Sequence, residues 1–291
     1  MDTQHSAENV WGLTLSFRDI ETERKYLQDV KAARVRHEIA SLPLTVLPGL
    51  ILAISNWGNF STLGLGMCLL NSLLCMGTVC LSRCNRQGYS TWRMVIIVVI
   101  TFQSLSLFHF LHEPPPAPTW IGILTRILFK SPSLPAMFFS LNFAFCFRDH
   151  LILRLMHLPC LLKWSWKFCS SCHASATHYE ATFQALGRTI DNVLSVFLVS
   201  SNEKNTFGCM SVVGMLSLTF GLLVPVGLRY FHDIFRRAAF LKRQIPAGSV
   251  SRVVDQSKSD SYETGAWFLV AGTEVIWIIS RVVGSFIDGW K

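Results

Sequence analysis

The segment Cys169–His173 has the sequence Cys-Ser-Ser-Cys-His, the spacing at which two thiols attach a haem group and the histidine ligates its iron. Such attachment takes place outside the cytosol, whereas the charge pattern of this chain puts the segment inside. A zinc site would need two more ligands, and His178 and Cys160 are the nearest candidates. Chance spacing in a cysteine-rich loop is the simplest interpretation, so we predict no haem, metal or other cofactor here. Palmitoylation of Cys84, Cys160, Cys169 or Cys172 fits this loop better than haem does.

Glu274 is the acidic residue that lies deepest inside a strongly apolar segment, 265–287. Burying it costs about 2.5–3.5 kcal/mol on membrane-insertion scales, and such residues often mark proton or cation pathways. Arg281 follows on the same helical face, about 10.5 Å along the axis, which is too far for a direct pair. Glu274 could equally be a hydrogen-bonded packing residue. Polar residues of other apolar segments could cluster with it or bond across helices, namely Asn71, Gln103, His109 and Asn142.

Motifs of the common enzyme classes are absent from the sequence. The chain has no P-loop, no G-x-S-x-G, no H-E-x-x-H and no dinucleotide-binding glycine run. No two carboxylates stand at catalytic spacing in an apolar segment. We therefore expect a protein that is not an enzyme.

The composition is that of a membrane protein. Of the 291 residues 51% are hydrophobic and only 15% are charged, whereas soluble domains carry about a quarter charged residues. The apolar segments predict an all-α, polytopic integral membrane protein, a bundle of about seven transmembrane helices over 39–287, each of about 20 residues. The predicted spans are 39–57, 61–82, 94–111, 131–147, 189–201, 206–228 and 265–287.

Positive charge sets the expected orientation, because Lys and Arg favour the cytoplasmic side of short loops. With the N-terminus inside, 21 of the 26 Lys and Arg residues fall in inner segments and only Lys204 and Lys291 fall outside. The segment 189–201 is short for a span, but it must cross to keep the basic segments 148–188 and 229–264 on the same side. The predicted orientation is therefore cytoplasmic at the N-terminus.

The segment 1–38 is predicted to contain a juxtamembrane helix over 16–38. Ser16 and Asp19 have the spacing of a helix-capping box. A solvated helix is the simplest expectation. Binding of a partner is the alternative, because a narrow apolar stripe runs along it, made of Phe17, Ile20, Leu27 and Val30.

Two more segments are expected at the membrane surface. The first is 120–130, anchored by Trp120, and the second is a helix within 148–188 whose leucines recur at helical spacing beside basic residues. The loop 229–264 begins with a basic amphipathic helix over 229–245, which anionic lipid would attract by about 1 kcal/mol per basic residue. Its lipid-binding candidates are Arg229, Arg236, Arg237, Lys242 and Arg243.

Small residues and cysteines complete the expectations. Ser217 and Gly221 form a small-x-x-x-small pair with Gly214 and Gly227 nearby, which predicts close helix packing within the bundle or between subunits. The nine cysteines have no regular extracellular spacing, so we expect reduced thiols rather than disulfides.

Two functions fit these features. The first is a membrane scaffold or signalling component that acts through its basic cytoplasmic loops, with lipids, a protein partner or a second copy as partners and no nucleic acid. The alternative is an ion or small-solute transporter or channel that uses Glu274. The small number of polar residues in the spans favours the first.

Overall fold

The structure, a computed structural model, describes most of the chain from Leu15 to Asp288. The described residues are 15, 17, 19–41, 43, 54, 62–110, 117, 119–129, 131–133, 136, 137, 139, 143, 146–173, 176–195, 207–244 and 251–288. Throughout this part the regular elements are helices, and no strand occurs in it. They are α1 (Ile20–Ser41), α3 (Thr62–Cys84), α4 (Arg86–Phe110), α5 (Trp120–Phe129), α7 (Phe147–His173), α8 (Ala176–Ser195), α9 (Cys209–Leu218), the π-helical turn η2 (Thr219–Leu223), α10 (Val224–Gln244) and α11 (Ser251–Asp288).

Three of the described helices are long and apolar enough to cross a membrane. They are Thr62–Cys84, Cys209–Arg243 and Tyr262–Gly284, with 23, 35 and 23 residues. About 20 residues suffice to span the hydrocarbon core. The all-α class is thus confirmed for the described residues, together with three helices suited to membrane insertion. The predicted span 39–57 lies almost entirely outside the described residues, and of 131–147 only scattered residues are described.

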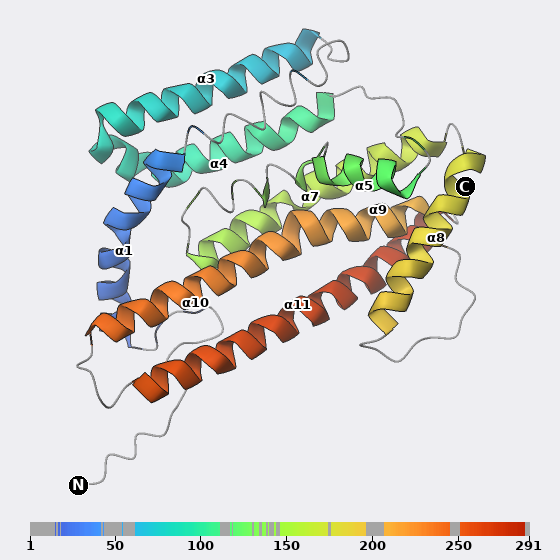
Figure 1. The fold of residues 1–291 in the computed structure, drawn as a ribbon. Helices are drawn as coiled ribbons and strands as arrows, with labels where there is room; N and C mark the ends of the chain where they lie inside the picture. Colours follow the sequence, from blue (N-terminus) through green and yellow to red (C-terminus); the bar gives the residue numbers. More distant parts are fainter. Residues whose placement is uncertain are drawn as a thin grey trace.

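The long helices lie side by side along one direction (Figure 1). Helices α9, η2 and α10 follow one another as a single continuous rod, against which α7 and α11 pack. Helices α3 and α4 pack against each other on the side of α7. Helix α1 crosses one end of this bundle, and α8 lies across the opposite end (Figure 1). We call the first of these the α1 end.

Helix α7, for which the sequence predicts a position on the membrane surface, packs within the bundle. It runs lengthwise in the bundle, and its outward face carries Ile152, Leu155 and Leu162, which are 52%, 52% and 40% exposed. Its inward face carries the fully buried Arg154 and His157. Lys163 and Lys167 also lie on the exposed side. The position of this helix at a membrane surface stays a prediction.

A disulfide joins the α8 end of α7 to the start of α9. The Cα atoms of Cys169 and Cys209 are 5.7 Å apart, and their sulfurs are bonded. The expectation that all nine cysteines are reduced is corrected by this bond. The sequence could not show it, because the pairing depends on α7 running the length of the bundle. Cys169 is consequently no ligand for haem or zinc.

The small residues of α9, η2 and α10 do permit close packing, as predicted, and their partners belong to the same chain. A Cβ added at Gly214 would lie 3.6 Å from Ser280 of α11, and one at Gly227 only 2.4 Å from Leu269. A Cβ at Gly221 would lie 2.7 Å from Leu161 of α7. These glycines therefore bring the two neighbouring helices close to the central rod.

Candidate functional site

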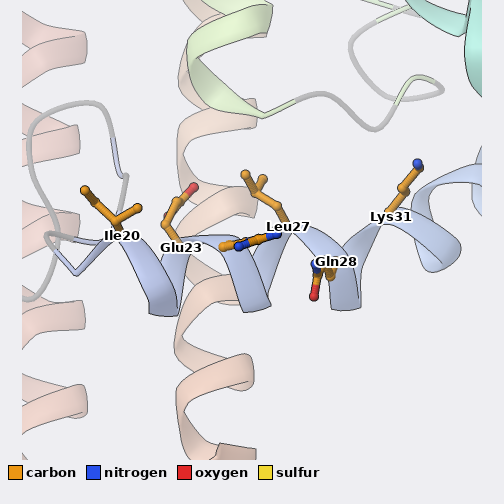
Figure 2. Close-up of a pocket in the computed structure, with 6 residues that line it drawn as sticks. Ile20, Glu23, Leu27, Gln28 and Lys31 are labelled. Carbon is orange, nitrogen blue, oxygen red and sulfur yellow. The ribbon is translucent and has the colours of Figure 1, made fainter.

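Helix α1 combines an open groove on one side with polar docking on the other. The groove has a volume of about 400 Å³ and is lined by Ile20, Glu23, Arg24, Leu27, Gln28 and Lys31 (Figure 2). Ile20 is 84% exposed and Leu27 is 37% exposed. The apolar stripe predicted for this helix is thus divided, because Phe17 and Val30 are buried inside the protein.

Asp19 fixes the start of α1. Its carboxylate accepts hydrogen bonds from the backbone N–H of Thr22 at 2.9 Å and from the Thr22 hydroxyl at 2.5 Å. These bonds lower the pKa of Asp19. The helix begins at Ile20, so Asp19 is the N-cap and the predicted start at Ser16 is wrong.

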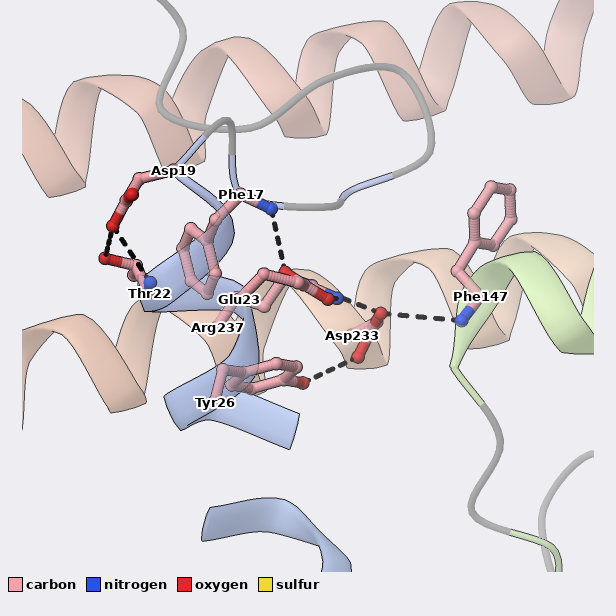
Figure 3. A network of polar contacts seen from close by, with 8 residues as sticks. All are labelled: Phe17, Asp19, Thr22, Glu23, Tyr26, Phe147, Asp233 and Arg237. Carbon is pink, nitrogen blue, oxygen red and sulfur yellow. Dashed lines mark hydrogen bonds and ion pairs between the residues drawn. The ribbon is translucent and has the colours of Figure 1, made fainter. Parts of the chain in front are cut away.

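An ion pair docks the first half of α1 on α10 (Figure 3). The guanidinium of Arg237 donates from Nη1 to Glu23 Oε2 at 2.5 Å and from Nη2 to Glu23 Oε1 at 3.0 Å. Its Nε lies 3.4 Å from Oδ2 of Asp233 on the same helix. Arg237 is 1% exposed, so this is a largely desolvated, bidentate pair.

Aromatic residues enclose this ion pair. The Tyr26 hydroxyl donates to Asp233 Oδ1 at 2.8 Å, and the guanidinium of Arg237 stands 4.2 Å from the centre of the Tyr26 ring. The backbone N–H of Phe17 donates to Glu23 Oε2 at 2.8 Å (Figure 3). The rings add cation–π attraction and exclude water, which strengthens the pair.

A second ion pair docks the other end of α1 on α4. The Arg93 guanidinium donates to both carboxylate oxygens of Glu38, at 2.6 Å from Nε to Oε2 and by a shorter bond from Nη2 to Oε1. The Tyr89 hydroxyl donates to Glu38 Oε2 at 3.2 Å. Glu38 is fully buried.

We call the residues of these two contacts the α1 clamp: Glu23, Tyr26, Glu38, Tyr89, Arg93, Asp233 and Arg237. Each guanidinium in it pairs with at least one carboxylate, and Asp233 additionally accepts from the Tyr26 hydroxyl. A site of this kind positions a helix and holds its rotation; it has no exposed nucleophile or base for catalysis. Local sequence patterns do not show it, because its partners are far apart along the chain.

The predicted lipid-binding residues of α10 differ from one another in how far they are buried. Arg229 and Arg237 are buried, and Arg236 is half-buried. Lys242 and Arg243 are exposed, and Arg243 pairs with Asp29 of α1 at 3.0 Å. Helix α10 thus turns much of its basic and apolar surface toward α1 and α11 rather than outward.

Of the polar residues predicted to lie in the membrane, Glu274 is half-buried, and no hydrogen bond or ion pair joins it to any described residue. Arg281 pairs with Asp191 of α8 at 3.6 Å, and Asp191 also accepts from the Trp277 indole at 3.1 Å. Asn71 is buried and accepts from the Ser104 hydroxyl, a bond between α3 and α4. Asn142 and the side chain of His109 lie outside the described residues. Among the described residues, Glu274, Arg281 and Asn71 have separate surroundings.

A buried basic cluster, His150, Arg154 and His157, lies inside the bundle on α7. Arg154 Nε donates to His150 Nε2 at 3.3 Å, and Nη1 lies 3.2 Å from His157 Nδ1. Nη2 donates to the carbonyl of Ala136. The guanidinium is thus solvated by two imidazoles and a carbonyl. Within the described part of the chain, no group of three His, Cys, Asp or Glu residues could hold a metal.

Comparison with known proteins adds no identity to this site. No family model matches the chain, and neither the curated proteins nor the solved structures contain a match.

Proposed function

We propose that this chain is a multi-pass membrane protein with a cytoplasmic N-terminus, and that it acts as a membrane scaffold or signalling component through its cytoplasmic face. The α1 clamp is the observation that carries the proposal. It fixes α1 across one end of the helical bundle while leaving a groove of that helix open. A groove whose shape is fixed by ion pairs suits the recognition of a partner rather than catalysis.

Two observations support a cytoplasmic position for the α1 end. Basic residues gather there, since the turn between α3 and α4 carries Arg83 and Arg86 and the end of α10 carries Lys242 and Arg243. The Cys169–Cys209 disulfide lies toward the opposite end, and disulfides persist in oxidising compartments. Both favour the same orientation.

The same orientation accommodates seven crossings, with α7 in place of 189–201 as the fifth. The crossings are then 39–57, α3, α4, 131–147, α7, the α9–α10 rod and α11. Helix α8 and Arg188 lie on the outer side in this topology. The outward apolar face of α7 supports it, because Ile152, Leu155 and Leu162 would face lipid.

Thiol mapping tests this topology. In a background that keeps the disulfide but lacks the other seven cysteines, single cysteines are introduced by Arg86→Cys, Val250→Cys, Pro116→Cys and Glu180→Cys. An impermeant reagent should label positions 116 and 180 in intact cells but not 86 and 250. Labelling at 250 contradicts the orientation. Protection at 180 contradicts only the crossing of α7.

The scaffold role is tested by comparing the proteins recovered with the full chain and with two variants. Glu23→Gln weakens the α1 clamp, whereas Lys25→Gln removes an exposed charge on another face of α1. A scaffold loses partners specifically in Glu23→Gln. Identical recovered sets for both variants and the wild type contradict the role.

A further inference from the structure

We propose that Ile20, Arg24, Leu27 and Lys31 of α1 form a binding site for an anionic phospholipid of the adjacent leaflet. This inference rests on the proposed membrane topology. It goes beyond it by placing the lipid contact on α1, whereas the sequence analysis expected it on α10. We call these four residues the α1 stripe.

The α1 stripe alternates apolar and cationic residues along one face. Its members are spaced by four, three and four residues, which aligns them on a single side of a helix. All four line the groove of about 400 Å³. Figure 2 shows Ile20, Leu27 and Lys31 projecting to the same side of α1, the side on which the green ribbon of α7 lies.

The α1 clamp sets the direction in which the stripe faces. Helix α1 lies across the bundle end, so it runs along the membrane surface when the bundle crosses the membrane (Figure 1). Ion pairs at Glu23 and Glu38 fix its rotation at two points. The stripe then faces the side of the bundle body, where the headgroups of the leaflet lie. Four residues of a largely polar helix are thus placed at the membrane interface.

The charges of the groove suit a phosphate-bearing headgroup. Arg24 and Lys31 stand about 10.5 Å apart along the helix axis, and no ion pair joins either of them to a described acidic residue. Glu23 also lines the groove, but Arg237 neutralises it. Lys25, on another face, is paired with Glu21 at 3.7 Å. The groove therefore carries net positive charge beside apolar surface.

A lipid fits this surface better than an acidic peptide does. Ile20 and Leu27 offer apolar contact on the same face as the two cations, which matches a molecule with acyl chains next to a charged head. The large apolar side chains exposed on the bundle, such as Leu63, Leu73 and Ile152, indicate that lipid already surrounds the helices next to α1.

Native mass spectrometry of the purified full-length chain in detergent tests the site. The protein is titrated with short-chain phosphatidylserine, with phosphatidylcholine and with inorganic phosphate. We expect phosphatidylserine to bind best and the double variant Arg24→Gln/Lys31→Gln to lose about 30-fold in affinity, since each basic residue near anionic lipid contributes a factor of about 5.4. Lys25→Gln, the matched control, should bind as the wild type does.

Two outcomes overturn the proposal. Equal phosphatidylserine affinity in the wild type and in Arg24→Gln/Lys31→Gln removes the stripe as the site. Displacement of the lipid by inorganic phosphate at equal concentration shows a simple anion site. A further variant, Ile20→Ser/Leu27→Ser, should bind both phosphatidylserine and phosphatidylcholine more weakly, and it should keep the preference for phosphatidylserine. Because the titration is done in detergent, its result is independent of the thiol mapping that tests orientation.

Discussion

Glu23 of α1 and Arg237 of α10 are 214 residues apart in the sequence and form a bidentate ion pair in the structure. Arg237 is almost fully buried, and Asp233 and the Tyr26 ring complete its surroundings. The N-terminal helix is therefore part of the bundle. Removing a charged pair from water costs desolvation free energy, which offsets much of the attraction between the charges. The main effect of the pair is therefore the single orientation that it imposes on α1.

Glu23→Gln should loosen α1 from α10. The amide keeps the shape but leaves Arg237 with Asp233 as its remaining acidic partner. We expect a loss of about 2 kcal/mol in unfolding free energy, less than for a fully buried pair because Glu23 is partly exposed. Hydrogen exchange over α1 in detergent measures the loosening. Lys25→Gln, which breaks only an exposed pair, should leave exchange unchanged; equal protection in Glu23→Gln and the wild type would contradict the role of the pair.

Gly284→Ala should disturb the contact between α9 and α11. The added Cβ would lie 2.2 Å from Ser211 Oγ and 2.9 Å from the Ser211 backbone nitrogen, so the helices must separate. We expect a loss of about 1–3 kcal/mol. Gly77→Ala is the matched control, because its Cβ meets nothing within 4 Å and alanine favours the helix by up to about 1 kcal/mol. Unfolding in detergent measures both, and a stable Gly284→Ala would refute the close approach.

Local sequence patterns predicted where several helices lie along the chain, but they did not predict which faces of these helices pack against other helices. The opposite charges at spacing four and the run of apolar residues anticipated α1 and the α9–α10 rod, because these signals depend on neighbours in sequence. The leucine pattern of α7 was ambiguous for a physical reason. An apolar face beside basic residues suits a helix on a surface and also a helix packed in a bundle, and the spacing alone does not show that Arg154 is buried.

The α1 clamp could not be predicted from the sequence. The residues Glu23, Glu38 and Asp233 stand in polar or ambiguous segments, where acidic residues are ordinarily solvated. Their function as anchors requires Arg93 and Arg237 to approach from distant parts of the chain. Glu274 interrupts an apolar segment, but its position in the sequence does not show which residues lie next to it in the fold.

Acid should fray the start of α1 through Asp19. Its pKa is lowered below the ordinary value of 3.8 by hydrogen bonds from Thr22, so the cap stabilises the helix above pH 3.8. The contribution is lost as the pH falls through the lowered pKa. Hydrogen exchange over the first turn, corrected for intrinsic rates, should rise below pH 3.8 in the wild type. Asp19→Asn keeps a capping acceptor without a titrating group, so it should remove the pH dependence; a persisting dependence would assign the effect elsewhere.

Reduction should destabilise the bundle through Cys169 and Cys209, whose sequence separation is 40 residues. Closing a loop of that size contributes about 2–4 kcal/mol, so Cys209→Ser should lower unfolding free energy by that amount. Alkylation of the denatured chain, with and without a reductant, counts the paired thiols by mass. Cys80→Ser, which changes an exposed free thiol, is the control. Alkylation of all nine cysteines without reductant would contradict the bond.

Arg154→Lys should destabilise the bundle more than Arg154→Met. The planar guanidinium reaches His150, His157 and the Ala136 carbonyl at once, which a single ammonium on a flexible stem cannot do. Lysine keeps a buried charge with fewer acceptors, and we expect it to cost about 3 kcal/mol. Methionine removes the charge and its desolvation penalty together, so part of the loss is recovered. Arg148→Lys on the same helix is the control, because Arg148 is exposed and pairs only with the adjacent Asp149 among described acidic residues. Chemical unfolding in detergent ranks the three variants, and an Arg154→Lys protein as stable as the wild type would show that the geometry of the guanidinium is unimportant.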